Sequence, residues 1–198
     1  MLLKEFEFGK FDEIYEIMEQ SFPEDERRTY EEQKGLLENP LYHIYVLQDM
    51  EDLSIQAFAA VWIFDSMLFL EHFAVHSRYR NLGLGARMLH EIATKLGKMV
   101  VLEVEPPETE LAARRIDFYK RNGFFFHTYP YIQPAMSDGR KEIPLFLMTS
   151  ERAISDEEFY EIRDLLYEQV YHVKGVPQQS ITHHTQELFW EDGGSSCL

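Results

Sequence analysis

Residues 67–97 read MLFLEHFAVHSRYRNLGLGARMLHEIATKLG, and the rest of the fold is inferred from this stretch outward. The first nine residues, Met67 to Val75, are mostly apolar and aromatic, which predicts a β-strand. From Gly83 to Gly97, apolar residues recur at spacings of three and four, which predicts an amphipathic helix closed by its final glycine. The apolar positions of that helix are Leu84, Met88, Leu89, Ile92 and Leu96.

A second strand, Met99 to Val104, is expected directly after this helix. A strand, a helix and a strand in succession imply a parallel pair. The segments 42–48 and 54–64 precede residue 67 and predict an antiparallel meander with it. The other predicted elements are strands over 2–8, 124–131 and 143–148 and helices over 11–18, 30–38 (with a capping box from Thr29 and Glu32), 110–122 and 156–171. Together they predict a mixed α/β sheet of about seven strands.

The composition is that of a globular domain. The chain has 198 residues, of which 45% are hydrophobic and 27% are charged. The single cysteine, Cys197, permits no disulfide within the chain, and Met1 to Glu5 lack the pattern of a secretory signal, so we expect a cytoplasmic protein. A net charge of −16 disfavours a nucleic-acid partner. No apolar run is long enough to predict a membrane span.

The polar loop between the first strand and its helix carries the chemistry. Gly83 and Gly85 stand where the helix begins, and without a Cβ they let backbone amides approach a ligand. The free N–H groups and positive dipole of a helix start bind phosphate, and Arg78 and Arg80 add positive charge beside them. The pattern therefore favours a pyrophosphate site, while a turn shaped by two glycines is the plainer alternative.

Two common phosphate motifs fit this loop less well. The sequence contains no P-loop string. The dinucleotide-binding pattern would need a third glycine at the position of Met88. Glu103 or Glu105 does lie about twenty residues beyond the loop, where that pattern places an acidic residue. A dinucleotide-dependent oxidoreductase therefore stays open as a lesser alternative.

A third pattern, Arg80-x-x-Gly83-x-Gly85, resembles the acetyl-CoA signature of the GNAT superfamily of N-acetyltransferases. Phe73-Ala74-Val75 resembles the strand end before that signature. IDFYKRNGF, at 116–124, resembles the family's second block, an aromatic pair on a helix followed by Gly-Phe. The resemblance implies an acetyltransferase domain over 1–150, with a twisted, mostly antiparallel sheet and helices on both faces. It does not cover 151–198, where we expect a helix near 156–171 and a polar tail.

The resemblance also implies roles for individual residues. Backbone groups of Phe73 and Val75 would bind the pantetheine arm of acetyl-CoA as an added strand would. Tyr119 would lie near the thioester sulfur, and Glu103 resembles the glutamate that some members use as a general base. CoA would leave as the product, and no metal is expected. The cofactor-binding residues implied are Phe73, Val75, Arg80, Asn81, Leu82, Gly83, Leu84, Gly85 and Ala86.

The chemistry of amide formation requires groups of these kinds. An amine attacks only as the free base, yet a lysine-like amine has a pKa near ~10.4, so a carboxylate must accept a proton directly or through water. Glu103 and Glu105 share one strand face, and Glu71 lies on the neighbouring strand, which leaves three candidates. The hydroxyl of Tyr119 can give a proton to the leaving thiolate.

We expect direct acetyl transfer from acetyl-CoA to a primary amine of a small molecule or peptide. The acidic residues between Glu16 and Glu32 suggest a cationic acceptor. Ala112 and Arg115 stand where the family often has an asparagine and a small residue, a departure that concerns the acceptor side. A CoA-binding sensor or scaffold without catalysis is the main alternative. The helix 156–171 and the tail would either form a homodimer contact or cover the acceptor cleft.

Overall fold

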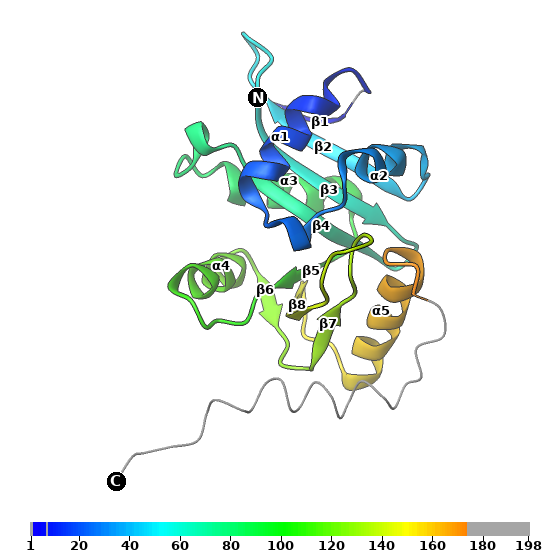
Figure 1. Ribbon diagram of the computed structural model, residues 1–198. Coiled ribbons are helices and arrows are strands. Elements are labelled where there is room, and N and C mark those ends of the chain that lie inside the picture. Colours follow the sequence, from blue (N-terminus) through cyan, green and yellow to red (C-terminus); the bar gives the residue numbers. More distant parts are fainter. Residues whose placement is uncertain (1, 7, 174–198) are drawn as a thin grey trace.

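The computed structural model describes residues 2–6 and 8–173, which form one open sheet with helices around it (Figure 1). Eight strands take the order β1-β2-β3-β4-β5-β8-β6, and β7 also pairs with β8. The strands are β1 Leu2–Glu5, β2 Tyr42–Gln48, β3 Ile55–Ile63, β4 Met67–Val75, β5 Met99–Val104, β6 Phe124–Phe126, β7 Tyr131–Gln133 and β8 Ile143–Ser150. The α-helices are α1 Phe11–Ser21, α2 Tyr30–Gly35, α3 Leu84–Leu96, α4 Glu110–Arg121 and α5 Asp156–Gln169.

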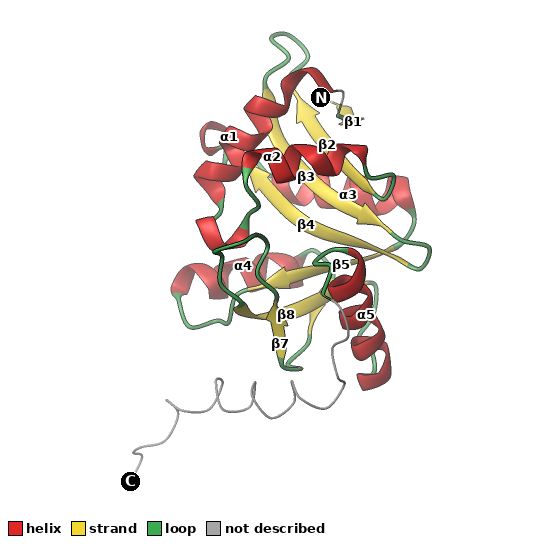
Figure 2. Ribbon diagram, turned by 45° about the vertical axis from the view of Figure 1, so that its right-hand side comes forward, coloured by secondary structure: helices red, strands yellow, loops and turns green. Residues whose placement is uncertain are grey.

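Helices cover both faces of the sheet, so two hydrophobic cores form. On one face, α1 and α5 pack against the strands, and Ile14, Trp62 and Phe159 are fully buried there. On the other face, α3 and α4 supply Met88 and Ile116 to a second cluster. Figure 2 shows α1 and α2 in front of the strands and α3 behind them. Among the described residues, no helix has the length and hydrophobicity of a membrane span.

Most of the predicted elements are confirmed. The bounds predicted for 42–48, 67–75 and 99–104 are those of β2, β4 and β5. Thr29 and Glu32 form the expected capping box, although the α-helix after them ends at Gly35 and continues as a 3₁₀ turn. α3 begins after Gly83 and ends before Gly97, both in the left-handed conformation. Cys197 and the rest of the tail beyond residue 173 lie outside the described residues.

The predicted strand over 124–131 is wrong in one respect, because it is two short strands. β6 pairs with the end of β8 and β7 with its beginning. The segment 127–130 between them ends in Pro130, which has no N–H to donate to a ladder. This interruption makes the sheet eight-stranded rather than seven-stranded.

β4 and β5 pair only over the first four residues of each strand, and this is the one parallel pairing among the described strands. Their ladder ends at Leu70–Leu102, although β4 continues to Val75 and β5 to Val104. Just beyond it, Ala60 pairs with His72 and Val61 with Leu70, so Glu71 bulges out of the β3–β4 register. A bulge bends a strand. The two strands diverge from this point (Figure 2).

The capping box at the start of α2 provides a test of the local structure. Thr29→Ala removes the side chain that accepts from the Glu32 amide, and we expect it to lower the free energy of unfolding by about 1 kcal/mol. Urea denaturation measures the change. Thr29→Ser keeps the hydroxyl and should stay close to the parent; equal loss in both variants would show that the methyl group, and not the cap, matters.

Candidate active site

A cavity of about 520 Å³ lies between the diverging ends of β4 and β5. The loop before α3, the first turn of α3 and α4 supply one group of lining residues. The segment from Ser21 to Glu26, together with β7 and β8, supplies another. The predicted catalytic residues, Glu103 and Tyr119, both line this cavity.

The free edge of β4 forms part of the cavity wall. His76 N–H donates to Gln56 O at 2.9 Å, so backbone groups of alternate residues before it point toward β3 or away from it. By this alternation the backbone N–H and C=O groups of Phe73 and Val75 point away from β3. They lie on the edge of β4 that no longer pairs with β5. The carbonyl of Val75 accepts from Arg80 Nε at 3.3 Å. An extended ligand could therefore add to this edge as a strand.

The loop that leads into α3 also lines the cavity. Asn81 and Gly83 both have positive φ, 64° and 74°, and a Cβ built on Gly83 would meet no atom within 4 Å. The first helical bond of α3 runs from Arg87 N to Gly83 O, so the preceding amides have no partner within the helix. Leu82 does not line the cavity and is 67% exposed. These amides and the open space beside Gly83 fit an anionic group.

Gly85 has a packing role besides the one the sequence suggests. A Cβ at this position would lie 3.2 Å from Cζ of Phe118 and 3.6 Å from Cζ of Phe73. Contacts of 3.2 Å are tighter than almost all real Cβ contacts, so a side chain here would push the Phe118 ring away. Gly85 therefore allows α3 and α4 to approach, in addition to any contact with a ligand.

Glu103 lines the cavity and forms no ion pair with a basic side chain among the described residues. It lies on β5, and its Oε1 accepts from the hydroxyls of Tyr131 and Tyr171. Burial raises the pKa of Glu103 to about 7, and the negative charges of Glu71 and Glu26 add to the rise. The two tyrosine hydrogen bonds lower the pKa, but by less than burial raises it. A carboxylate with this pKa can accept a proton near neutral pH.

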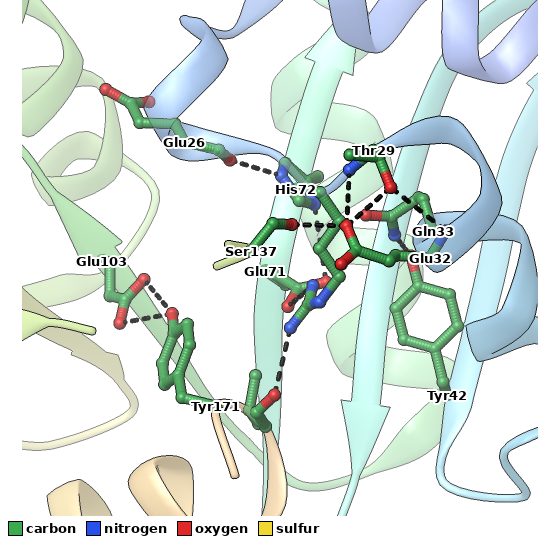
Figure 3. Close-up of polar contacts among 12 residues, drawn as sticks. Glu26, Thr29, Glu32, Gln33, Tyr42, Glu71, His72, Glu103, Ser137 and Tyr171 are labelled. Carbon is green, nitrogen blue, oxygen red and sulfur yellow. Dashed lines mark hydrogen bonds and ion pairs between the residues drawn. The ribbon is translucent and has the colours of Figure 1, made fainter. Parts of the chain in front are cut away.

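Glu71 has the opposite environment (Figure 3). Arg28 Nη1 lies 2.6 Å from its Oε1, and His72 Nδ1 lies 3.5 Å from its Oε2. Burial alone would raise the pKa of Glu71, but Arg28 and His72 together lower it to about 2. Glu71 therefore stays ionised at neutral pH and is a poor proton acceptor. Of the three candidate bases, this geometry disfavours Glu71.

Glu105 is also paired, which separates it from Glu103. Arg115 Nη1 lies 2.8 Å from Glu105 Oε2, and both side chains are partly exposed. Arg115 is one of the two residues at which the chain departs from the family pattern, and it lines the cavity together with Glu26. Burial raises the pKa of Glu26, and the negative charge of Glu105 raises it further.

Tyr119 lies on α4, with its ring edge-on to Phe118 and Phe124. Burial raises the pKa of Tyr119 to about 12, and Arg115 lowers it slightly. Within residues 2–6 and 8–173, no hydrogen-bond partner is found for its hydroxyl. Tyr119 is thus protonated at neutral pH and lines the same cavity as Glu103.

Four contributors to the site carry no recognisable signal in the sequence. Tyr131 and Tyr171 bind Glu103 from 28 and 68 residues away, and Arg28 reaches Glu71 across 43 residues. Gln133 lines the cavity, is 4% exposed, and has a side-chain amide nitrogen without a hydrogen-bond partner among the described residues. All four come from elements outside the strand–loop–helix pattern.

Comparison with known proteins identifies the family. Residues 11–124 match the model of the acetyltransferase (GNAT) family, which is more than half of the chain. The protein belongs to the GNAT family of acetyltransferases. A dinucleotide-dependent oxidoreductase of the kind considered above would need a doubly wound parallel sheet. The sheet here is mostly antiparallel, which disfavours that alternative.

Three relatives illustrate the range of similarity. YjbC of Bacillus subtilis (strain 168), named as a provisional acetyltransferase, is 27% identical over 165 residues, which cover 81% of this chain and 82% of that protein. A solved structure from Bacteroides thetaiotaomicron, named as a provisional GNAT acetyltransferase, is 31% identical, with a TM-score of 0.78, and covers 88% of this chain and 100% of that chain. The ribosomal-protein-S18-alanine N-acetyltransferase from Escherichia coli shares the fold at 22% identity, with a TM-score of 0.57, over 79% of this chain and 96% of that chain.

Replacing Arg28 should expose the dependence of the site on a buried ion pair. Arg28→Ala leaves the Glu71 carboxylate buried without its partner, so we expect the free energy of unfolding to fall by about 3–5 kcal/mol. Urea denaturation at pH 7 measures it. Arg114→Ala, which breaks the exposed pair with Glu110, should have no measurable effect. A small loss for Arg28→Ala would show that water replaces the guanidinium.

Proposed function

We propose that this protein is an acetyl-CoA-dependent N-acetyltransferase that passes the acetyl group directly to a primary amine. One observation carries the proposal: a single cavity joins an open strand edge and free helix amides to a carboxylate with a pKa near 7 and a protonated tyrosine. The membership of the GNAT family supports acetyl transfer.

The residues present fit acetyl-CoA. Phe73 and Val75 would hydrogen-bond the pantetheine arm along the free edge of β4. The amides of Gly83 to Ala86, with Arg80 beside them, would hold the pyrophosphate at the start of α3. When bound, acetyl-CoA supplies a thioester carbonyl that a nitrogen can attack.

The side chains then divide the proton transfers. Glu103 takes the proton that the attacking nitrogen must lose, and releases it to solvent afterwards. Tyr119 holds a proton for the departing sulfur and regains one from solvent. Because a thiol pKa is near ~8.5, the sulfur leaves readily and the contribution of Tyr119 is the smaller one. The rest of the rate enhancement comes from holding both reactants in one cavity.

The acceptor side of the cavity suits a cationic amine. Glu26 lines it, and no basic side chain in the described part of the chain forms an ion pair with its carboxylate. The unpartnered amide of Gln133 would hydrogen-bond a polar group next to the amine. Both features support an acceptor that carries an ammonium group and a neighbouring hydrogen-bonding group.

Substitution of Gly83 tests cofactor binding alone. Gly83→Ala places a side chain in the open space at a left-handed residue, and we expect CoA affinity to fall about tenfold or more by isothermal titration calorimetry. Gly97→Ala is the matched control, because it strains the same helix at its other end, where φ is 60°. Equal affinity in the two variants would contradict the site; binding of NAD(H) in place of CoA would favour an oxidoreductase.

Turnover tests the catalytic roles. With acetyl-CoA and a panel of cationic, neutral and anionic amines, we expect CoA release with cationic acceptors. Glu103→Gln should lower kcat about 10²–10⁴-fold and Tyr119→Phe about tenfold. In the parent, kcat/KM should rise with pH to a plateau above about pH 7, since Glu103 acts in its ionised form. Glu110→Gln, on the exposed face of α4, is the control.

The outcomes separate the remaining alternatives. CoA binding without turnover of any amine would favour a sensor or scaffold. Full activity in both Glu103→Gln and Tyr119→Phe would refute the mechanism while leaving acetyl transfer intact. A preference for anionic acceptors would refute the cationic acceptor.

A further inference from the structure

The end of α5 reaches the catalytic cavity. After α5 stops at Gln169, the amides of Val170 and Tyr171 donate to Leu166 O at 2.9 and 3.1 Å, and Val173 N donates to Tyr167 O at 2.8 Å. His172, at φ 56°, allows this closing turn. Three backbone hydrogen bonds hold the turn, so Tyr171 has a defined position at the end of the helix.

One group of this turn contacts the arginine that pairs with Glu71, and another contacts Glu103 directly. The carbonyl of Val170 accepts from Arg28 Nη2 at 3.0 Å, and Arg28 pairs with Glu71. The hydroxyl of Tyr171 lies 2.9 Å from Oε1 and 2.8 Å from Oε2 of Glu103. Figure 3 shows the second contact, with the Glu103 carboxylate facing the hydroxyl of Tyr171. Neighbouring residues therefore connect α5 to both β4 and β5.

The two oxygens of Glu103 are not equivalent. Oε1 accepts from Tyr131 and from Tyr171, whereas Oε2 shares only the Tyr171 hydroxyl. Both tyrosines keep their protons, because burial raises their pKa well above the usual value and the negative charge of Glu103 raises it further. Oε2 is therefore the oxygen with spare capacity to accept a proton.

The groups around Glu103 otherwise oppose its ionisation. Glu71 from β4 and Glu26, in the turn Glu24–Glu26, both add negative charge, and Tyr167 of α5 lies close enough to interact with Glu103. Arg28 is nearby but is committed to Glu71. The hydroxyls of Tyr131 and Tyr171 are thus the groups that favour the carboxylate over the neutral acid.

We propose that Tyr171, together with Tyr131, is a positioning residue that holds Glu103 in the cavity and leaves Oε2 to receive the proton. This inference rests on the proposed function, in which Glu103 is the base. It makes the turn after α5 a part of the catalytic site rather than only a part of the core.

The pH profile of the enzyme tests this role. Tyr171→Phe keeps the ring but removes the hydroxyl, so the midpoint of the acidic limb of kcat/KM should rise by about one pH unit, with KM for acetyl-CoA unchanged. Tyr131→Phe should shift it in the same direction. Tyr167→Phe is the matched control, since this buried hydroxyl of the same helix donates to the carbonyl of Ile132 and not to Glu103. An unmoved midpoint in Tyr171→Phe, or an equal shift in Tyr167→Phe, would overturn the proposal.

A second measurement needs no activity. Because the folded-state pKa of Glu103 lies above its unfolded value, the stability that it contributes is present at low pH and is lost as pH rises toward about 7. In Tyr171→Phe the loss of stability should continue above pH 7, so the difference in Tm between pH 5.5 and pH 8.5 should be larger than in the parent. In the double variant Tyr171→Phe/Glu103→Gln this increase should vanish. An increase that persists in the double variant would overturn the proposal. Should no amine be turned over, this measurement still decides on Tyr171, while the proposed function fails separately.

Discussion

The separation of β4 and β5 beyond Leu70–Leu102 is the constraint on which the site depends. While the strands are paired, their backbone groups satisfy each other; beyond that pair, β4 keeps an unpaired edge and the two strand ends enclose a cavity. The bulge at Glu71 coincides with the point of divergence. Had the ladder continued to Val75, the edge of β4 that fits an extended ligand would be covered.

This opening places two glutamates on adjacent strands in opposite electrostatic environments. Glu71 has a guanidinium at 2.6 Å and stays ionised, while Glu103 has only tyrosine hydroxyls and is partly protonated at neutral pH. The pairing of Glu71 with Arg28 also keeps that guanidinium away from Glu103, where a positive charge would stabilise the carboxylate and weaken it as a base. The surroundings of Glu71 and Glu103 are thus linked through the turn after α5. This turn contacts Arg28, the partner of Glu71, and also contacts Glu103.

Local patterns in the sequence predicted the elements that position the loop. The glycines at both ends of α3, the capping box of α2 and the bounds of β4 and β5 depend on neighbouring residues alone. The prediction for 124–131 was wrong because aromatic residues stand on both sides of the break, which contains Pro130. The sequence predicts ligand approach at Gly85, but not that a Cβ there would crowd Phe118, because Phe118 lies on another helix.

From its residue pattern alone, the chain establishes a mixed sheet, a loop suited to a diphosphate and three candidate bases. Which of these glutamates can accept a proton depends on partners 28 to 68 residues away, since Tyr131, Tyr171 and Arg28 meet them only when the sheet closes. Burial and charge set a pKa, and both are properties of the folded chain that spacing along the sequence does not encode. The sequence thus supplies the three carboxylates, and folding places Glu71 and Glu105 in ion pairs and leaves Glu103 with tyrosine hydroxyls at the cavity.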